Sequence, residues 1–299
     1  MQPFRNYISN QNLLLDSLLR HLGTWLPDVI YIKLRYRFQV GRQLDLRNPR
    51  SFQEKIQWLK LYDHNPRYSQ LVDKVLVKDY VSSLIGKEYV VPLLGVWDNP
   101  EDIDWDSLPN QFVLKTNHSG GNTGVVICRD KESFDRQKAV SRLKTSLKSD
   151  VYRDLREWPY KGLIKKVFAE EYLESPEQED LPDYKWYCFN GVPIFCQLIQ
   201  NRTTNETIDF YDTEWNHQEF IGLNPSASFA TFSAEKPDNL EIQIKIARAL
   251  SKDIPFVRID LYSIGTRVYF GEFTFYPFSG MGQFAPIQYN EILGDMISL

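Results

Sequence analysis

The sequence predicts an α+β fold in which a helical section precedes a mixture of strands and helices. Between residues 11 and 40, apolar residues recur at steps of three and four, the period of an amphipathic helix, with a break near Pro27. From residue 89 onward the pattern changes to short β-type runs with helical stretches between them. Because 42% of the 299 residues are hydrophobic, the chain can bury a sizeable core.

The elements follow from local signals. Ser51 with Glu54 three residues later is a capping signal that opens a helix, and Asn65-Pro66 ends it. The next helix is expected from about residue 68 to 84 and closes at Gly86. Further helices are expected near residues 132–150 and 238–252. The predicted strands are 89–94, 111–116, 124–128, 167–172, 184–189 and 193–200.

Composition argues against several classes of protein. The 35 Lys and Arg residues against 39 Asp and Glu residues leave a net charge of −4, whereas a general nucleic-acid binder needs a basic excess. Cys128, Cys188 and Cys196 are an odd number without CxxC spacing, so neither a disulfide framework nor a zinc ribbon is indicated, and we expect a reducing, cytoplasmic location. No window reaches the roughly 18 apolar residues of a membrane span, and no signal peptide is expected.

One local region departs from the acidic average. Between residues 31 and 51 the charged residues are six Lys or Arg and one Asp, interleaved with Tyr31, Tyr36 and Phe38. This pattern has two interpretations. It is either a solvated helix face beside a core, or a basic and aromatic surface for an anionic lipid headgroup or a polyanionic glycan.

A β-hairpin around Gly265, between residues 256 and 276, carries the sharpest chemical signal. A three-residue loop over 264–266 would place residue 260 opposite 270 and residue 258 opposite 272. One face then carries Arg258, Asp260, Glu272 and Thr274. Two carboxylates at diagonal positions, about 7 to 8 Å apart at Cα, can hold a divalent cation such as Mg²⁺. The alternative is an Arg258–Glu272 ion pair on a solvated face, with Asp260 incidental.

A glycine-containing loop is the second signal. Lys115 ends one apolar run, and Gly120, Gly121 and Gly124 follow before the next. Such a loop can lay its N–H groups over phosphate oxygens while the lysine supplies a charge. It lacks the Gly-Lys-Ser/Thr ending of a Walker A loop, and a plain hairpin loop is the alternative.

The order of these signals resembles the ATP-grasp superfamily over roughly residues 71–299. The residues that carry the resemblance are Lys74 before a helix, Lys115 with its glycine loop, Phe-Ala-Glu-Glu-Tyr-Leu at 168–173, and the Arg-x-Asp and Glu-x-Thr hairpin. Four stretches, at 51–59, 156–161, 183–191 and 271–277, resemble the TupA-like branch, which is associated with teichuronopeptide and other surface-polysaccharide loci. This second resemblance extends back to about Ser51.

The resemblance implies an ATP-grasp fold of two α+β subdomains that grip ATP, preceded by an N-terminal helical section. The expected division is a helical section over 1–70 and an ATP-grasp domain over 71–299. Within that domain, 71–172 holds the first helix and the small subdomain with the glycine loop. The range 173–299 is the C-terminal metal-binding subdomain.

It also implies roles for individual residues at the nucleotide. Lys74 and Lys115 match lysines on the ATP phosphates, and the three glycines match the loop that closes over the triphosphate. The strand that holds adenine and the sugar corresponds to Glu170, Glu171, Tyr172 and Leu173. Lys185 is either an adenine or phosphate contact or an ion-pair partner of Asp183.

At the reacting end, Arg258 matches the arginine that steadies the transferring phosphoryl group, and Asp260 and Glu272 match the magnesium ligands. Thr274 stands where the family usually has Asn, so its role is either metal ligation or hydrogen bonding. Arg202 is an additional phosphate or carboxylate clamp or a solvated side chain. The candidate acceptor-binding residues are His118, Arg156, Ser279 and Gly280, and the alternative for His118 is a solvated loop histidine.

The implied activity is an ATP- and Mg²⁺-dependent carboxylate–amine ligase that acts through an acyl phosphate. No protein nucleophile is needed for this reaction, in agreement with the absence of a Gly-x-Ser-x-Gly motif. The expected partners are a uronic acid of a surface or capsular polysaccharide, or its precursor, and an amino acid or amine. The basic N-terminal section predicts peripheral contact with the inner face of the membrane. The alternatives are an ATP-dependent phosphotransferase on a glycan precursor and a non-catalytic glycan-binding protein.

Overall fold

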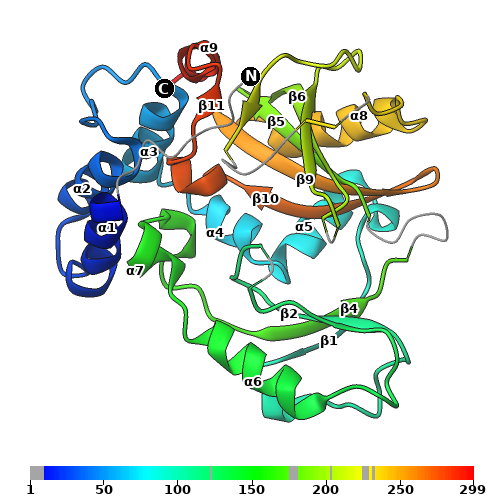
Figure 1. The fold of residues 1–299 in the computed structure, drawn as a ribbon. Helices are drawn as coiled ribbons and strands as arrows, with labels where there is room; N and C mark the ends of the chain where they lie inside the picture. The colour runs from blue at the N-terminus through cyan, green and yellow to red at the C-terminus, as the bar shows by residue number, and fades with distance from the viewer. Residues whose placement is uncertain (1–9, 122, 175–180, 203, 224–228, 231–232) are drawn as a thin grey trace.

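Two antiparallel sheets organise the chain in the computed structural model, which describes residues 10–121, 123–174, 181–202, 204–223, 229–230 and 233–299 (Figure 1). The smaller sheet has the order β1-β4-β2-β3, and the larger has the order β10-β9-β5-β6-β7. β8 (Ile221–Gly222) and β11 (Phe284–Ala285) form a separate two-stranded pair. The predicted α+β class is therefore confirmed.

The N-terminal helices follow the sequence pattern closely. α1 (Asn10–Leu22) and α2 (Asp28–Val40) are separated at Pro27, and α3 (Phe52–Tyr62) begins after Ser51. The predicted capping box is present, because Glu54 N–H donates to Ser51 Oγ at 3.3 Å and Ser51 N–H donates to Glu54 Oε2 at 3.0 Å. Phe52, Ile56 and Leu59 of α3 belong to the core of the larger sheet.

The helix predicted over 68–84 is wrong in one respect, because it is broken at Asp73. α4 (Arg67–Val72) ends there and α5 (Leu76–Ile85) begins three residues later. Asp73 Oδ1 accepts hydrogen bonds from the N–H groups of Val75 and Leu76, at 2.8 and 3.1 Å, and so offers the backbone an alternative to helix. The break leaves Lys74 on a connection between the two helices.

The smaller sheet is covered by α6 (Arg136–Leu147). Its core includes Phe112, Leu114, Leu143, Val167 and Ala169. The strands are β1 (Leu93–Trp97), β2 (Phe112–Thr116), β3 (Val126–Cys128) and β4 (Val167–Glu171). Near it in sequence lie α7 (Val151–Leu155) and the 3₁₀ turns η1 (Lys87–Tyr89), η2 (Pro100–Asp102) and η3 (Trp158–Tyr160).

The larger sheet packs one face on helices and turns its polar face away from them. Trp186 donates to Gln243 of α8 (Leu240–Ser251) at 3.0 Å, and Phe273 contacts Tyr80 of α5. Its strands are β5 (Asp183–Phe189), β6 (Val192–Gln200), β7 (Thr207–Tyr211), β9 (Phe256–Ile264) and β10 (Arg267–Thr274). The chain ends with η4 (Pro277–Gly280) and α9 (Tyr289–Asp295).

The predicted register of the β9–β10 hairpin is wrong, although its predicted polar face is correct. Ile264 pairs with Arg267 around a two-residue turn, and Phe270 pairs with Leu261. A β-bulge at Gly271 then shifts the register by one residue, so Glu272 faces Asp260 and Thr274 faces Arg258. A Cβ at position 271 would lie 3.1 Å from Asp260 O, so glycine suits this close approach.

Two of the three aromatic residues of the basic region are not surface residues. Tyr31 and Tyr36 are fully buried, and Arg35 donates from Nε to Asp16 Oδ1 at 2.8 Å in a buried ion pair. The interpretation of residues 31–51 as a basic and aromatic surface is therefore wrong for these three side chains. Among the described residues, no helix combines the length and the apolar character that crossing a membrane requires.

The contact between α9 and α3 generates a stability prediction. A Cβ on Gly294 would lie 2.0 Å from Arg50 O, a backbone atom just before the α3 cap. We expect Gly294→Ala to destabilise the fold by about 2 kcal/mol or more, because the backbone must shift to relieve the overlap. Gly120→Ala is the control, since a Cβ there meets nothing within 4 Å. Urea unfolding measures both, and equal midpoints for the two variants would contradict this packing.

Candidate active site

A cleft of about 1110 Å³ lies between the two sheets and receives polar side chains from both. The larger sheet contributes Lys185, Arg258, Asp260 and Glu272. The smaller sheet contributes Lys115, Glu170 and Glu171, and the α4–α5 region contributes Lys74 and Lys78. Residues that lie up to 198 positions apart in the sequence therefore meet across this space.

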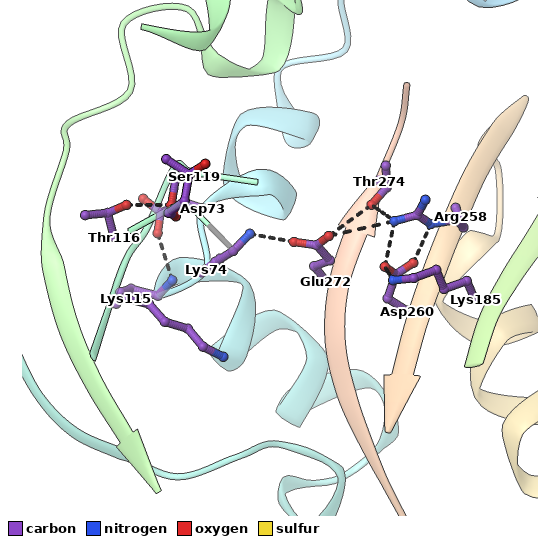
Figure 2. A network of polar contacts seen from close by, with 12 residues as sticks. Asp73, Lys74, Lys115, Thr116, Ser119, Lys185, Arg258, Asp260, Glu272 and Thr274 are labelled. Atoms are coloured by element: carbon purple, nitrogen blue, oxygen red, sulfur yellow. Dashed lines mark hydrogen bonds and ion pairs between the residues drawn. The ribbon is translucent and has the colours of Figure 1, made fainter. Parts of the chain in front are cut away.

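On the larger sheet, the carboxylate of Asp260 lies between two cations. Arg258 donates from Nε to Oδ1 at 2.6 Å and from Nη2 to Oδ2 at 2.7 Å, and Lys185 forms an ion pair with the same Oδ2 (Figure 2). β5 positions Lys185 directly opposite Asp260 in the sheet. Lys185 therefore pairs with Asp260 and not with Asp183 as one alternative expected, and its contact with adenine or phosphate stays a prediction.

Glu272 continues this cluster toward the helices. Lys74 donates to Glu272 Oε2 at 2.6 Å, and Arg258 Nη2 lies 3.9 Å from Glu272 Oε1 (Figure 2). Burial raises the pKa of Glu272, but Lys74 and Lys185 outweigh it and lower the pKa to about 2. Thr274 accepts from Arg258 at 3.0 Å and donates to Glu272 at 3.4 Å, so the role observed for it is hydrogen bonding.

The smaller sheet presents a second charged cluster. Glu170 is buried and receives Lys115 on one oxygen and Lys78 on the other, the latter at 2.9 Å. Burial raises the pKa of Glu170, and the two lysines lower it below its ordinary value. Lys78 was not among the residues predicted from the sequence. Lys78 lies four residues after Lys74, and this spacing could have indicated that both lysines serve one site. The same spacing is ordinary within an uninterrupted helix, so it did not single out Lys78.

A buried asparagine, also missed from the sequence, fixes the connection that carries Lys74. Asn117 Nδ2 donates to Asp73 Oδ2 at 2.8 Å and to Ile164 O at 2.9 Å, and its Oδ1 accepts from Lys166 N–H at 2.8 Å. Lys74 N–H in turn donates to Asn117 O at 3.0 Å. These hydrogen bonds hold the residues before α5 to those after β2. They place Lys74 so that its side chain reaches Glu272.

The glycine loop is anchored at its base and open at its tip. Thr116 and Ser119 are joined by a hydroxyl hydrogen bond of 2.6 Å, and Ser119 Oγ donates to Thr123 O at 2.7 Å (Figure 2). Gly124 has φ +72° and is packed so that a Cβ would lie 2.2 Å from Ser146 Oγ. Nothing lies within 4 Å of a Cβ built on Gly120 or Gly121, and Gly121 lines the cleft.

The segment after β4 also borders the cleft. Glu171, Tyr172 and Leu173 line it, and Arg129 Nε donates to Tyr172 Oη at 3.2 Å. Arg202 lines it as well, and its exposed side chain forms an ion pair with the buried Asp183, while its role as a phosphate or carboxylate clamp stays a prediction. These residues surround the part of the cleft next to Glu170.

The loop after β10 is held from the N-terminal section. Lys60 donates to both Ser279 O and Ser279 Oγ at 2.6 Å, and Gln57 donates to Gly280 O at 2.9 Å. Phe278 and Ser279 have φ of +48° and +54°, a backbone conformation that costs free energy and persists where neighbours enforce it. The N–H of Ser279 donates to Tyr276 O at 2.7 Å, so it is already paired, and Phe278 is the member of this loop that lines the cleft.

None of the four predicted acceptor residues lines this cleft: Ser279 and Gly280 lie in the loop behind Phe278, and the other two lie elsewhere. Arg156 is buried against the N-terminal helices, where it donates to Thr24 O at 2.8 Å, pairs with Asp28 at 3.0 Å and covers the ring of Tyr31. His118 is buried beside a separate cavity of about 90 Å³, and its Nε2 lies 3.2 Å from Ser149 Oγ. Both positions follow from packing that local sequence does not reveal.

The donor set at Asp260 and Glu272 fits Mg²⁺ in the presence of phosphate. Mg²⁺ is usually held by one or two carboxylates together with substrate phosphates and water. The two carboxylates lie opposite each other on adjacent strands, with the Thr274 hydroxyl beside them. No group of three or more His, Cys, Asp or Glu side chains suited to a metal ion occurs in the described part of the chain.

These features define the class of protein. Two antiparallel sheets that face a cleft lined with lysines, an arginine and paired carboxylates form an ATP-grasp fold. The sequence model of the TupA-like ATP-grasp family matches residues 54–298, and the chain belongs to that family. A comparison with curated proteins gave no match.

Solved structures similar to the chain include several ATP-grasp ligases. D-alanine–D-alanine ligase from Bacillus anthracis is 18% identical over 76% of this chain and 66% of that chain, with a TM-score of 0.45. The ligase from Helicobacter pylori is 14% identical over 78% and 64%, with a TM-score of 0.40. The ATP-grasp ligase PsnB, complexed with minimal precursor, Mg and ADP, is 13% identical over 90% and 67%, with a TM-score of 0.39. The chain thus spans just under two thirds of the two D-alanine–D-alanine ligases.

The Lys74–Glu272 pair generates a pH prediction. A carboxyl group whose folded-state pKa is about 2 rather than 4.5 contributes stability above pH 4.5 and loses it as the pH falls toward 2. We therefore expect Lys74→Met to raise the pKa of Glu272 and to cost about 1 kcal/mol at neutral pH, with a smaller cost in acid. Carboxyl NMR titration and urea unfolding at two pH values measure these effects.

Lys87→Met, at an exposed lysine in η1, is the matched control and should leave the Glu272 titration unchanged. If Lys74→Met left the titration unchanged as well, the ion pair would not be the cause of the depressed pKa.

Proposed function

We propose that the protein is an ATP- and Mg²⁺-dependent carboxylate–amine ligase that acts through an acyl phosphate. The observation that carries the proposal is the pairing of two charged clusters across one cleft in a member of the TupA-like ATP-grasp family. Lys74, Lys185 and Arg258 face two carboxylates on the larger sheet. Lys78 and Lys115 face one carboxylate on the smaller sheet.

Each cluster therefore has one more cation than carboxylate among the residues named. A triphosphate is attracted by such a surplus, because cations in a partly buried site act through a lower effective dielectric than in water. Arg258 lines the cleft and is suited to the transferring phosphoryl group, since a guanidinium has five N–H donors and the bonds to Asp260 and Thr274 use three of them. Gly120 and Gly121 form the open tip of the glycine loop, so the backbone of this loop has room to approach the phosphates.

Asp260 and Glu272 would hold the metal. Bound there together with the phosphates, Mg²⁺ would offset the negative charge that builds up during phosphoryl transfer. The positions of the two carboxylates are set by the sheet register and by Arg258, Lys185 and Lys74, so these cations act as positioning residues for the metal ligands.

The proposed reaction has two balanced steps. A carboxylate oxygen of the acceptor attacks the γ-phosphorus of ATP, the bond to the bridging oxygen breaks, and ADP leaves. An amine then attacks the acyl carbon, phosphate leaves with the electron pair of the C–O bond, and the amine loses a proton to give an amide. Arg258, Lys74 and Lys115 would stabilise the phosphoryl charge, and a closed cleft would exclude the water that hydrolyses the intermediate.

For the acceptor, we propose a uronic acid of a surface or capsular polysaccharide or of its precursor, joined to an amino acid or another amine. The TupA-like branch that the sequence resembles is associated with surface-polysaccharide loci, which supports this substrate class. Phe278 and the loop behind it, which Gln57 holds through a backbone carbonyl, form one wall of the cleft and are candidates for acceptor contact.

Nucleotide binding tests the site itself. We expect isothermal calorimetry to show Mg²⁺-dependent ATP binding that weakens at least tenfold in Lys115→Met and in Glu272→Gln, because each change removes one charged contact from the proposed phosphate or metal site. Asp98→Asn, at an exposed carboxylate outside the cleft, is the control. Unchanged affinity in both cleft variants would contradict the assignment.

Hydroxylamine trapping tests the chemistry. With ATP, Mg²⁺ and a uronic acid such as glucuronate, an acyl phosphate should react with hydroxylamine to give a hydroxamate, and ADP release should rise with an added amine. Arg258→Lys should lower the rate by about 100-fold, because a single ammonium cannot replace the two-point donor. Formation of a stable phosphorylated sugar without a hydroxamate would favour a phosphotransferase instead.

A further inference from the structure

Helix α1 packs with one acidic side chain, Asp16, facing inward. Asp16 is buried, and its two oxygens accept from Arg35 Nε at 2.8 Å and from Gln39 Nε2 at 2.7 Å, both on α2. A surface helix normally turns its apolar stripe to the body of the protein and its charges to water. In α1 this arrangement is partly reversed: Asp16 holds the helix to α2 in a buried ion pair, most of the leucines are exposed, and Arg20 and His21 also face water.

The reversal exposes the leucines of α1. Leu14, Leu18 and Leu22 are 63%, 47% and 69% exposed, and Leu15 is 44% exposed. At 100° per residue these four side chains lie within an arc of about 100° on the helix. They therefore form one continuous apolar stripe on the side opposite Asp16.

Two further large apolar side chains are exposed in the turn between α1 and α2 and at the start of α2. Trp25 is 80% exposed, and Ile30 on the first turn of α2 is 49% exposed. The α1–α2 hairpin stands at the edge of the molecule, away from the two sheets (Figure 1). Large exposed apolar patches on soluble domains mark surfaces that bind a partner. We call the exposed side chains Leu14, Leu15, Leu18, Leu22, Trp25 and Ile30 the apolar ridge.

The charge of the section that carries the apolar ridge indicates what it binds. Within residues 10–50 the exposed basic side chains are Arg20, Lys33, Arg37, Arg42, Arg47 and Arg50, and the exposed acidic one is Asp45. This local surplus occurs in a chain whose net charge is −4. An apolar helix face with tryptophan beside it and basic residues around it is the pattern of helices that lie in the interface of an anionic membrane.

We propose that the α1–α2 hairpin docks on an anionic lipid surface, with the apolar ridge in the interfacial layer and the surrounding basic side chains at the headgroups. A second copy of the chain is a poorer occupant, because a two-fold contact through this region would bring the same basic groups together. The proposal does not rest on the ligase function. It would bring the cleft close to a lipid-linked acceptor.

Vesicle sedimentation tests the proposal. The full chain is mixed with vesicles of phosphatidylglycerol and phosphatidylcholine, or of phosphatidylcholine alone, and the bound fraction is measured. We expect binding to the anionic vesicles, weakened at least tenfold in Leu18→Ser/Trp25→Ser. The matched control is Leu84→Ser/Ile164→Ser, whose side chains are 47% and 74% exposed elsewhere, and it should bind as the parent does. Lys33→Gln/Arg37→Gln should lose affinity for the anionic vesicles.

Three results would overturn the proposal. They are no vesicle binding by the parent chain, equal loss in the apolar-ridge and control variants, or a dimer in light scattering that Leu18→Ser/Trp25→Ser abolishes while vesicle binding is absent. Leu14→Ser serves as a milder variant if the double variant does not fold by circular dichroism. ATP calorimetry on the same samples keeps this test separate from the proposed function, because the apolar ridge lies outside the cleft.

Discussion

The β-bulge at Gly271 is the constraint on which the site depends. Without it, the two-residue turn would place Glu272 on the apolar face of the hairpin, because one residue of slip reverses every side chain of a strand. The bulge restores the alternation just before Glu272 and sets that carboxylate opposite Asp260. Arg258 and Thr274, which also face each other, then complete a polar face above the helix-packed core.

The charges of this face are balanced by contributions from separate elements. Lys185 comes from the neighbouring strand β5, and Lys74 comes from the connection between α4 and α5. Asp73 and Asn117 hold that break in place and connect it to the end of β2. The smaller sheet supplies Glu170 with two lysines from different elements. The lysines lower the pKa of both Glu170 and Glu272 and, through their ion pairs, orient the two carboxylates.

The N-terminal section has two different relations to the rest of the molecule. α3 is part of the core of the larger sheet, and its Lys60 and Gln57 hold the loop that carries Phe278 into the cleft. α1, in contrast, is attached to α2 through Asp16 and exposes its leucines. The same helical section therefore both shapes one wall of the cleft and forms the apolar ridge. The proposed division at residues 1–70, 71–172 and 173–299 stays a prediction.

Local patterns determined much of what was expected. Periodicity placed the first helices and most of the strands, and motif order identified the ATP-grasp family together with the residues Lys115, Glu170, Arg258, Asp260 and Glu272. β8 and β11 were not predicted, because strands of two residues have no period. β7 was not predicted, because Asp209 interrupts its apolar run. Tertiary structure alone decided the hairpin register, the break at Asp73, the role of Lys78, the burial of Arg156 and His118, and the inverted packing of α1. Each of these depends on a partner distant in sequence, and local sequence carries no information about which partner a side chain will meet.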